Sequence, residues 1–237
     1  MKEKSTNKLQ IFLIGGNSVI GGAILNGVLR KHKDQDIDIY SFIRTSYKEK
    51  IPGEVITVND YIESVEYINN VHKEGARQII IISFGVLVVE KKDNNFSENL
   101  NYHLHVNTFQ SFNIFKLLLD SIKLREFHIV SSVLADFIRP SLYSYSVSKN
   151  LLELLIDNLI KTKEIKEKVF IWKPAFVDSR LNKGRKSSGF KTSPKKITNM
   201  VSKKIKGGSY YIPRVAGIFT FIAKFTSPLI KWVDKRI

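Results

Sequence analysis

The sequence contains no cysteine. Disulfide bonds, metal sites built on thiolates and catalysis by a cysteine nucleophile are therefore excluded. The chain also lacks an uninterrupted apolar run of the ~20 residues that a membrane-spanning helix needs. Its first apolar run, Leu9 to Ile14, is too short for the core of a signal peptide, and no cleavage-site pattern follows it. We therefore expect a cytoplasmic protein.

Acidic residues are scarce in the C-terminal third. Residues 1–160 carry 18 basic and 18 acidic side chains, whereas residues 161–237 carry 20 basic and 4 acidic ones. The whole formal charge of +16 thus belongs to the last third, where the stretch from Arg180 to Lys206 has ten basic residues and no acid. This asymmetry favours an anionic partner at one end of the molecule, and a solvated lysine-rich surface is the alternative. No basic–aromatic motif indicates a nucleic acid as partner.

Short apolar runs and helical patterns alternate along the chain. The apolar runs predict buried strands at 9–14, 37–43, 55–58, 78–84, 127–130, 169–172 and 210–212. The helical patterns predict helices at 19–30, 61–72, 96–122, 143–160 and 199–205, the second of them capped by Asp60. This order predicts a single α/β domain with a Rossmann-type, doubly wound parallel sheet in three layers. Ligands bind such sheets beyond the carboxyl ends of the strands.

A glycine-rich turn joins the first predicted strand to the first predicted helix. It runs from Gly15 to Gly22 and contains four glycines. A turn of this kind lets backbone N–H groups and a helix N-terminus approach a pyrophosphate, and an ordinary strand-to-helix turn is the alternative. The turn therefore predicts dinucleotide contacts by Gly15, Asn17, Ser18, Ile20 and Gly21.

The tip of the second predicted strand bears Arg44 and Thr45 and no acid. NAD-specific sites use an acid at this place to bind the ribose 2′-hydroxyl, whereas an arginine suits a 2′-phosphate. The expected cofactor is therefore NADP, bound in part by Arg44 and Thr45. An arginine that merely faces solvent is the alternative.

Tyr145 and Lys149 are four residues apart in a predicted helix, so their side chains share a face. A nearby ammonium favours phenolate, and we expect Lys149 to lower the pKa of Tyr145 from its usual value of about 10. Tyr145 would then donate a proton to a carbonyl under reduction. Ser132 follows the fifth predicted strand, 13 residues before Tyr145, and its hydroxyl suits the same carbonyl.

In order and spacing, these residues resemble the short-chain dehydrogenase/reductase family, single-domain subclass, over roughly residues 9–215. The resemblance implies that Tyr145 is the general acid/base, that Ser132 orients the substrate and that Lys149 holds the nicotinamide ribose. It implies that Asn107 supports a water-linked proton relay and that Asp60 contacts the adenine. The further cofactor contacts that it implies are Ser83, Gly85, Pro174 and Val177.

We therefore expect residues 1–214 to form an NADPH-dependent oxidoreductase that reduces a keto group to an alcohol. The expected substrate is a small-molecule or lipid-linked carbonyl compound, for example a phosphorylated or lipid-linked keto-sugar, and the expected assembly is a homo-oligomer. A sugar-nucleotide epimerase or dehydratase of the same family and a non-catalytic NADP-binding regulator are the alternatives. No metal site is expected, because His103 and His105 lie on different faces of a helix with no carboxylate cluster nearby.

The C-terminal segment 215–237 is apolar at helical spacing but also contains Lys224, Pro228 and Lys231. This pattern suits an amphipathic helix on an anionic membrane surface, at the inner face of the cell membrane. A helix packed on the body or at a dimer interface fits equally well. By the family resemblance, residues 179–191 cover the substrate, where their cations would meet phosphate groups.

Overall fold

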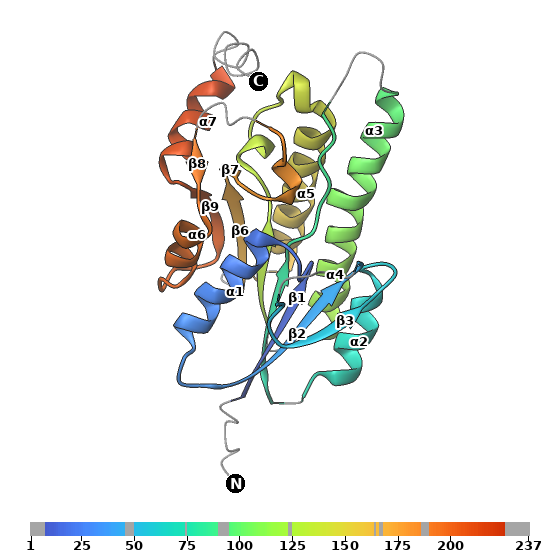
Figure 1. Ribbon diagram of the computed structural model, residues 1–237, viewed down its shortest axis with the longest axis vertical. Coiled ribbons are helices and arrows are strands. Elements are labelled where there is room, and N and C mark those ends of the chain that lie inside the picture. The colour runs from blue at the N-terminus through green and yellow to red at the C-terminus, as the bar shows by residue number, and fades with distance from the viewer. Residues whose placement is uncertain are drawn as a thin grey trace.

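The structure is a computed structural model that describes residues 8–45, 50–73, 75–89, 95–122, 125–163, 165, 168–185 and 190–225. A seven-stranded parallel sheet with the order β3-β2-β1-β4-β5-β6-β9 forms its centre (Figure 1). The strands are β1 (Lys8–Ile14), β2 (Asp36–Ile43), β3 (Glu54–Thr57), β4 (Arg77–Ile82), β5 (Arg125–Val130), β6 (Val169–Pro174) and β9 (Gly208–Ile212). A separate parallel pair consists of β7 (Phe176–Val177) and β8 (Lys191–Thr192). The predicted doubly wound parallel sheet is confirmed.

Helices cover both faces of the sheet and give three layers. One face packs against α1 (Val19–Lys31) and α6 (Pro194–Val201). The other face packs against α2 (Glu63–Val71), α4 (Ser111–Ser121) and α5 (Tyr143–Lys163). The helix expected at 96–122 is present as α3 (Phe96–His103), a π-helical stretch over Leu104–Gln110, and α4. The last helix in the described part of the chain is α7 (Val215–Phe225).

Strand β1 shows why the strands read as unbroken apolar runs. Side chains alternate between the two faces of a strand, and here each face is covered by helices. Phe12 and Ile14 belong to the core beneath α2, α4 and α5. The intervening side chains belong to the core beneath α1 and α6, and they are Leu9, Ile11 and Leu13. Both faces exclude water, so these five positions are apolar, and the buried polar exception in the strand is Gln10.

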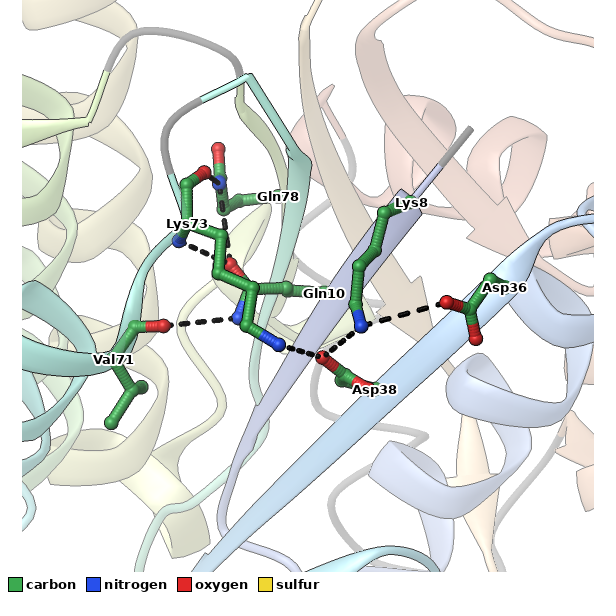
Figure 2. A network of polar contacts seen from close by, with 7 residues as sticks. All are labelled: Lys8, Gln10, Asp36, Asp38, Val71, Lys73 and Gln78. Atoms are coloured by element: carbon green, nitrogen blue, oxygen red, sulfur yellow. Dashed lines mark hydrogen bonds and ion pairs between the residues drawn. The ribbon is translucent and has the colours of Figure 1, made fainter. Parts of the chain in front are cut away.

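Polar groups tie β1, β2 and the α2–β4 connection together at the amino ends of the strands (Figure 2). Asp38 accepts from the Nζ atoms of Lys73 at 3.0 Å and Lys8 at 3.3 Å. The buried Gln10 amide donates to the Val71 carbonyl at 3.1 Å and accepts from the Lys73 backbone N–H at 2.8 Å. Exposed ion pairs contribute little individually. The buried amide is therefore the more important part of this network.

A second polar cluster lies at the start of β5. The carboxylate of Glu126 contacts Arg77, lies 3.5 Å from Lys31 Nζ and accepts from His128 Nε2 at 3.0 Å. The indole of Trp172 donates to His128 Nδ1 at 3.0 Å, which leaves the His128 proton on Nε2. Burial alone would raise the pKa of Glu126, but the His128 hydrogen bond and the two cations hold that pKa at about 2. The buried acid at this end of the sheet is thus fully compensated.

Two helices begin at other residues than expected. The helix expected at 199–205 is wrong, because α6 begins at Pro194 and ends at Val201. Ser193 caps this helix and Pro194 occupies its first turn, a combination that starts helices. Helix α2 begins at Glu63 rather than at residue 61. Asp60 nevertheless caps the preceding turn, since its Oδ1 accepts from the Ile62 backbone N–H at 2.9 Å.

Candidate active site

A cavity of about 1310 Å³ opens beyond the carboxyl ends of the central strands. Strands β1 and β4 are neighbours, but the sheet continues from β1 toward β2 and from β4 toward β5, in opposite directions. Loops that leave in opposite directions create a crevice between them, where doubly wound sheets bind ligands. The walls come from the segments that follow β1 to β6 and from α3, α5 and α7.

The glycine turn fits against the segment that follows β4. Gly15 has a φ of +93°, and a Cβ at this position would lie 2.9 Å from the Phe84 backbone nitrogen. A Cβ at Gly21 would lie 2.2 Å from Ser83 Oγ. The Ser83 hydroxyl itself donates to the Ile14 carbonyl at 3.2 Å. Gly15 and Gly21 therefore act through close backbone packing, which positions the turn and the first turn of α1.

Asn17, Ser18 and Ile20 line the cavity at the N-terminus of α1. Ser18 caps this helix, and its Oγ accepts from the Gly21 backbone N–H at 3.1 Å. The first turn contains no acidic residue. A helix N-terminus carries partial positive charge and backbone N–H groups without helical partners, so this wall suits a phosphate.

Arg44 and Tyr61 form the wall beyond β2 and β3. The Arg44 guanidinium lies 5.0 Å from the centre of the Tyr61 ring, a cation–π geometry, and both residues line the cavity. Burial raises the pKa of the Tyr61 hydroxyl, while the charges of Arg44 and Arg180 oppose that shift. Tyr61 was not predicted as a site residue. An aromatic residue at the first position after a capping acid carries no distinguishing signal in sequence.

Four predicted cofactor contacts do not line this cavity: Gly15 and Gly21, which pack against the segment after β4, and Asp60 and Thr45. The Asp60 carboxylate accepts from the Ile62 backbone and, at 2.6 Å, from Gln110 Nε2, so both of its oxygens are used within the protein. Thr45 is exposed. The other predicted cofactor contacts that lie in the cavity wall are Ser83, Gly85, Pro174 and Val177.

Ser132, Tyr145 and Lys149 all line this cavity. Ser132 follows β5 and caps a short 3-10 helix, with its Oγ accepting from the Leu134 backbone N–H at 3.2 Å. The Tyr145 hydroxyl is hydrogen-bonded to the Ser132 side chain. Lys149 is 3% exposed, and its Nζ donates to the Val130 carbonyl at 3.1 Å. Ser132 and Tyr145 therefore form a hydrogen-bonded pair, and the buried Lys149 lines the same cavity.

Burial dominates the electrostatics of this group. It raises the pKa of Tyr145, while the Ser132 hydrogen bond and the charge of Arg185 act in the opposite direction. Burial also lowers the pKa of Lys149 to about 8, with Glu153 opposing. The expectation that Lys149 lowers the pKa of Tyr145 is therefore wrong. Both residues line the same cavity, but removal of water from the phenol raises its pKa by more than the Ser132 hydrogen bond and the charge of Arg185 lower it.

Asn107 lies in the π-helical stretch and is fully buried. Its Oδ1 accepts from the Val86 backbone N–H at 2.8 Å, and its Nδ2 donates to the Val86 carbonyl at 3.0 Å and to Ser148 Oγ at 3.1 Å. A Cβ at Gly85 would lie 2.9 Å from Asn107 Oδ1 and 3.6 Å from Lys149 Nζ. Asn107 thus holds the segment after β4 close to Lys149, and the relay role implied for it stays a prediction.

A buried ionic cluster behind Ser132 was missed by sequence reasoning. Lys173 Nζ lies 3.0 and 3.1 Å from the two carboxylate oxygens of Asp136 and 2.6 Å from Glu153 Oε2. The other Glu153 oxygen accepts from the Ser131 hydroxyl. Burial opposes the charge on Lys173, but the two carboxylates raise its pKa above its usual range. The one feature of the sequence that could have indicated this cluster is Glu153, an acid one helical turn beyond Lys149.

The C-terminal segment closes part of the cavity. Ala216, Phe219 and Thr220 of α7 line it, and the Phe219 ring lies 6.2 Å from Phe137 and 5.4 Å from Phe190. Within the described residues, α7 thus packs on the body with one face and exposes Ile218, Phe221 and Ile222 on the other. No helix among these residues is long and apolar enough to cross a membrane. Residues 226–237, including Pro228 and Lys231, lie outside the described residues.

The lining is basic. Among the described residues it contains Arg44, Arg139, Lys149, Arg180 and Arg185, and no aspartate or glutamate. No group of three potential metal ligands occurs in the described ranges. The cavity is therefore suited to an anionic ligand.

Comparisons with known proteins identify the fold. No family model matches the chain, and no curated protein is similar enough to count as a relative. A short-chain dehydrogenase from Burkholderia cenocepacia in complex with NADP is 17% identical, with a TM-score of 0.71 over 91% of this chain and 92% of that chain. An alcohol dehydrogenase from Thermococcus sibiricus complexed with 5-hydroxy-NADP is 16% identical, with a TM-score of 0.67 over 86% and 95% of the two chains. The aldohexose dehydrogenase of Thermoplasma acidophilum is 15% identical, with a TM-score of 0.67 over 88% and 94%. The chain has the fold of the short-chain dehydrogenases/reductases.

Adjacent glycines in α1 test the packing of the turn. A Cβ at Gly21 meets Ser83, whereas a Cβ at Gly22 meets nothing within 4 Å. We expect Gly21→Ala to lower the free energy of unfolding by about 1–3 kcal/mol, as overpacking does. Gly22→Ala should raise it by up to about 1 kcal/mol, because alanine is the better helix former. Urea unfolding of both variants measures these values, and equal effects would contradict the packing described.

Proposed function

We propose that the protein is an NADPH-dependent oxidoreductase that reduces a keto group to an alcohol, with Tyr145 as the proton donor. The meeting of Ser132, Tyr145 and Lys149 inside one cavity is the observation that carries this proposal. Two neighbours of the same fold are described with NADP or an NADP derivative, which supports the choice of cofactor. The oxidoreductase names of all three neighbours support the reaction class.

The residues present fit NADPH along the length of the cavity. The N-terminus of α1, with Asn17 and Ser18, would hold the pyrophosphate. Arg44 would hold the 2′-phosphate, and no acid at the tip of β2 stands against it. Lys149 and Gly85 would hold the nicotinamide ribose. Pro174 and Val177 would line the far side of the nicotinamide.

NADPH, when bound, supplies a hydride for the carbonyl carbon. Tyr145 donates its hydroxyl proton to the carbonyl oxygen, and its raised pKa keeps that proton in place at neutral pH. Ser132 is hydrogen-bonded to Tyr145 and so can donate to the same oxygen. Below its pKa of about 8, Lys149 is positively charged and stabilises the phenolate that the proton transfer leaves behind.

The substrate of the proposed reaction is a phosphorylated or lipid-linked carbonyl compound. The basic lining of the cavity supports the anionic part of this assignment. Consumption of NADPH in step with substrate distinguishes a reductase from an epimerase, which regenerates its cofactor, and from a regulator, which only binds it. A homo-oligomer and a cytoplasmic location both stay predictions.

Removal of the Tyr145 hydroxyl tests the proton donor. We expect Tyr145→Phe to lower turnover by ~10²–10⁴-fold, the usual contribution of a general acid, while NADPH binding stays nearly unchanged. Tyr143→Phe is the matched control, because Tyr143 lies in the same helical turn but is 38% exposed and outside the cavity lining. Steady-state NADPH oxidation gives the turnover. Activity of Tyr145→Phe within a few-fold of the wild type would remove Tyr145 from the mechanism.

Cofactor choice should depend on Arg44. A charge-assisted hydrogen bond contributes about 1.5–3 kcal/mol, so Arg44→Ala should weaken NADPH binding by on the order of 10–100-fold. NADH has no 2′-phosphate and should be little affected. Arg30→Ala is the control, because Arg30 bonds to Asn199 on the surface. Fluorescence titration gives both affinities, and equal weakening of NADPH and NADH would show that Arg44 does not discriminate between them.

We further propose that the outer face of α7 contacts an anionic membrane surface. Ile218 is 64% exposed and Phe221 is 65% exposed, in the strongly basic third of the chain. Phe219 and Ala216 line the cavity, so point substitutions on the outer face are a cleaner test than truncation after Pro213.

In co-sedimentation with anionic vesicles at low salt, the wild type should bind. Ile218→Ser combined with Phe221→Ser should release most of the protein, since both apolar anchors are lost. Val55→Ser, at an exposed apolar position on β3, should change little. Neutral vesicles should bind less than anionic ones, because the cations contribute on the order of 1 kcal/mol each only near an anionic surface. Wild-type protein that stays in the supernatant would contradict the proposal.

A further inference from the structure

Apart from Lys149, the cations of the cavity form two pairs, and each pair includes a charge that opposes the raised pKa of a different tyrosine. The charges of Arg44 and Arg180 both oppose the rise in the pKa of the Tyr61 hydroxyl. This pair lies at the end of the cavity where the 2′-phosphate of NADPH would bind. The charge of Arg185 instead opposes the rise in the pKa of the Tyr145 hydroxyl, and the charge of Arg139 lowers the pKa of Arg185. The proposed cofactor site accounts for the first pair. It leaves the second pair, which lies beside the proton donor, without a role.

Both residues of the second pair are built into the cavity wall. Arg139 is 5% exposed, and its backbone N–H donates to Ser146 Oγ of α5 at 3.5 Å. Arg185 lies in the segment after β7, where its Nη1 donates to Asn182 Oδ1 at 3.1 Å. Asn182 in turn donates from Nδ2 to the Val177 carbonyl at 2.9 Å. These contacts hold the Arg185 guanidinium and the Arg139 backbone in place before any ligand arrives.

The Arg185 guanidinium retains an unused donor. Its Nε is buried and has no hydrogen-bond partner among the described residues. Burial and the positive charge of Arg139 both lower the pKa of Arg185 from its ordinary value, with Tyr145 acting in the other direction. Arginine does not lose its proton in proteins, so deprotonation cannot remove the cost of the unpaired Nε–H and of the two neighbouring positive charges. An anion that accepts from Nε and lies near both charges would offset that cost.

Aromatic side chains line the same cavity as this pair. Phe137, two residues before Arg139, and Phe190, five residues after Arg185, both line the cavity. Phe219 of α7 lies between their rings. A ligand held here would therefore combine an anionic group with an apolar body.

We propose that Arg185 and Arg139 bind an anionic group, a carboxylate or a phosphate monoester, on the carbonyl substrate. The planar fork of Arg185 bonds the anion, Arg139 adds its charge, and the apolar body of the substrate lies against the three phenylalanines. The keto group then lies beside Tyr145. This inference rests on the proposed reductase function, but it makes a statement about binding that can be tested without turnover.

Calorimetric titration of the whole chain with three six-carbon probes tests the anion site. Hexyl phosphate and hexanoate carry the two candidate anions, and hexanol carries none. We expect at least one anionic probe to bind the wild type, and Arg185→Gln to weaken that binding by on the order of 10-fold or more, the loss of a charge-assisted hydrogen bond. Hexanol should bind both proteins equally. The stronger of the two anionic probes identifies the group.

Lys183→Gln is the matched control, because Lys183 is an exposed cation two residues away and outside the cavity lining. It should bind the probes as the wild type does. Arg185→Lys keeps the charge without the Nε–H and should bind the anionic probe with intermediate affinity. This variant tests the role of Arg185 if the glutamine variant does not fold. Unchanged affinity in a folded Arg185→Gln, or no anion binding by the wild type, would overturn the proposal.

Arg44→Ala separates the two ends of the cavity. If this variant loses the anionic probe as strongly as Arg185→Gln, the anion occupies the cofactor end and the inference is wrong. NADPH oxidation is measured separately with an aliphatic keto acid and the matching ketone. Probe binding that depends on Arg185 without any turnover would support the anion site and refute the reductase, so the two failures are distinguishable.

Discussion

The site depends on one close contact, between the glycine turn after β1 and the segment after β4. These strands are neighbours whose loops leave in opposite directions, and the absence of side chains at Gly15 and Gly21 lets the two segments touch. Ser83 fixes the contact through its hydrogen bond to the Ile14 carbonyl. A looser contact would move the N-terminus of α1 away from the wall that contains Gly85. The helix N-terminus and Lys149 would then no longer face the same cavity.

Charge is balanced at one end of the sheet and unbalanced at the other. At the amino ends of the strands, buried Glu126 is compensated by Arg77, Lys31 and His128. At the carboxyl ends, the described cavity lining has five cations and no acid. Part of the positive charge of the C-terminal third therefore lines the cavity, on the exposed Arg180 and the half-buried Arg185. An excess of cations in a cavity favours anionic ligands more strongly than the same excess on a surface, because water screens it less.

Removal of water sets the properties of the polar group at the centre. Burial raises the pKa of Tyr145 and lowers that of Lys149, so the phenol keeps its proton while the amine gives up its own more easily. Directly behind, the ionic cluster of Lys173, Asp136 and Glu153 holds Ser131 through its hydroxyl. Breaking such a cluster by removing one partner leaves a buried charge uncompensated, which is costly. The cluster thus joins β6, α5 and the segment after β5 behind the site.

The sequence by itself determined the alternation of strands and helices, the glycine turn, and the placement of Ser132, Tyr145 and Lys149 in one site. The periodicity of apolar residues predicts the strands and helices. The carboxyl ends of parallel strands lie at the same edge of a sheet, which brings residues that follow different strands together. Tertiary structure alone decided the direction of the Tyr145 pKa, the pairing of Arg139 with Arg185, and the packing of Phe219 over the cavity. It also decided that Asp60 bonds to Gln110 rather than facing the cavity. Each of these depends on burial or on contacts between residues far apart in the chain. The pattern of neighbouring residues in the sequence predicts neither of them.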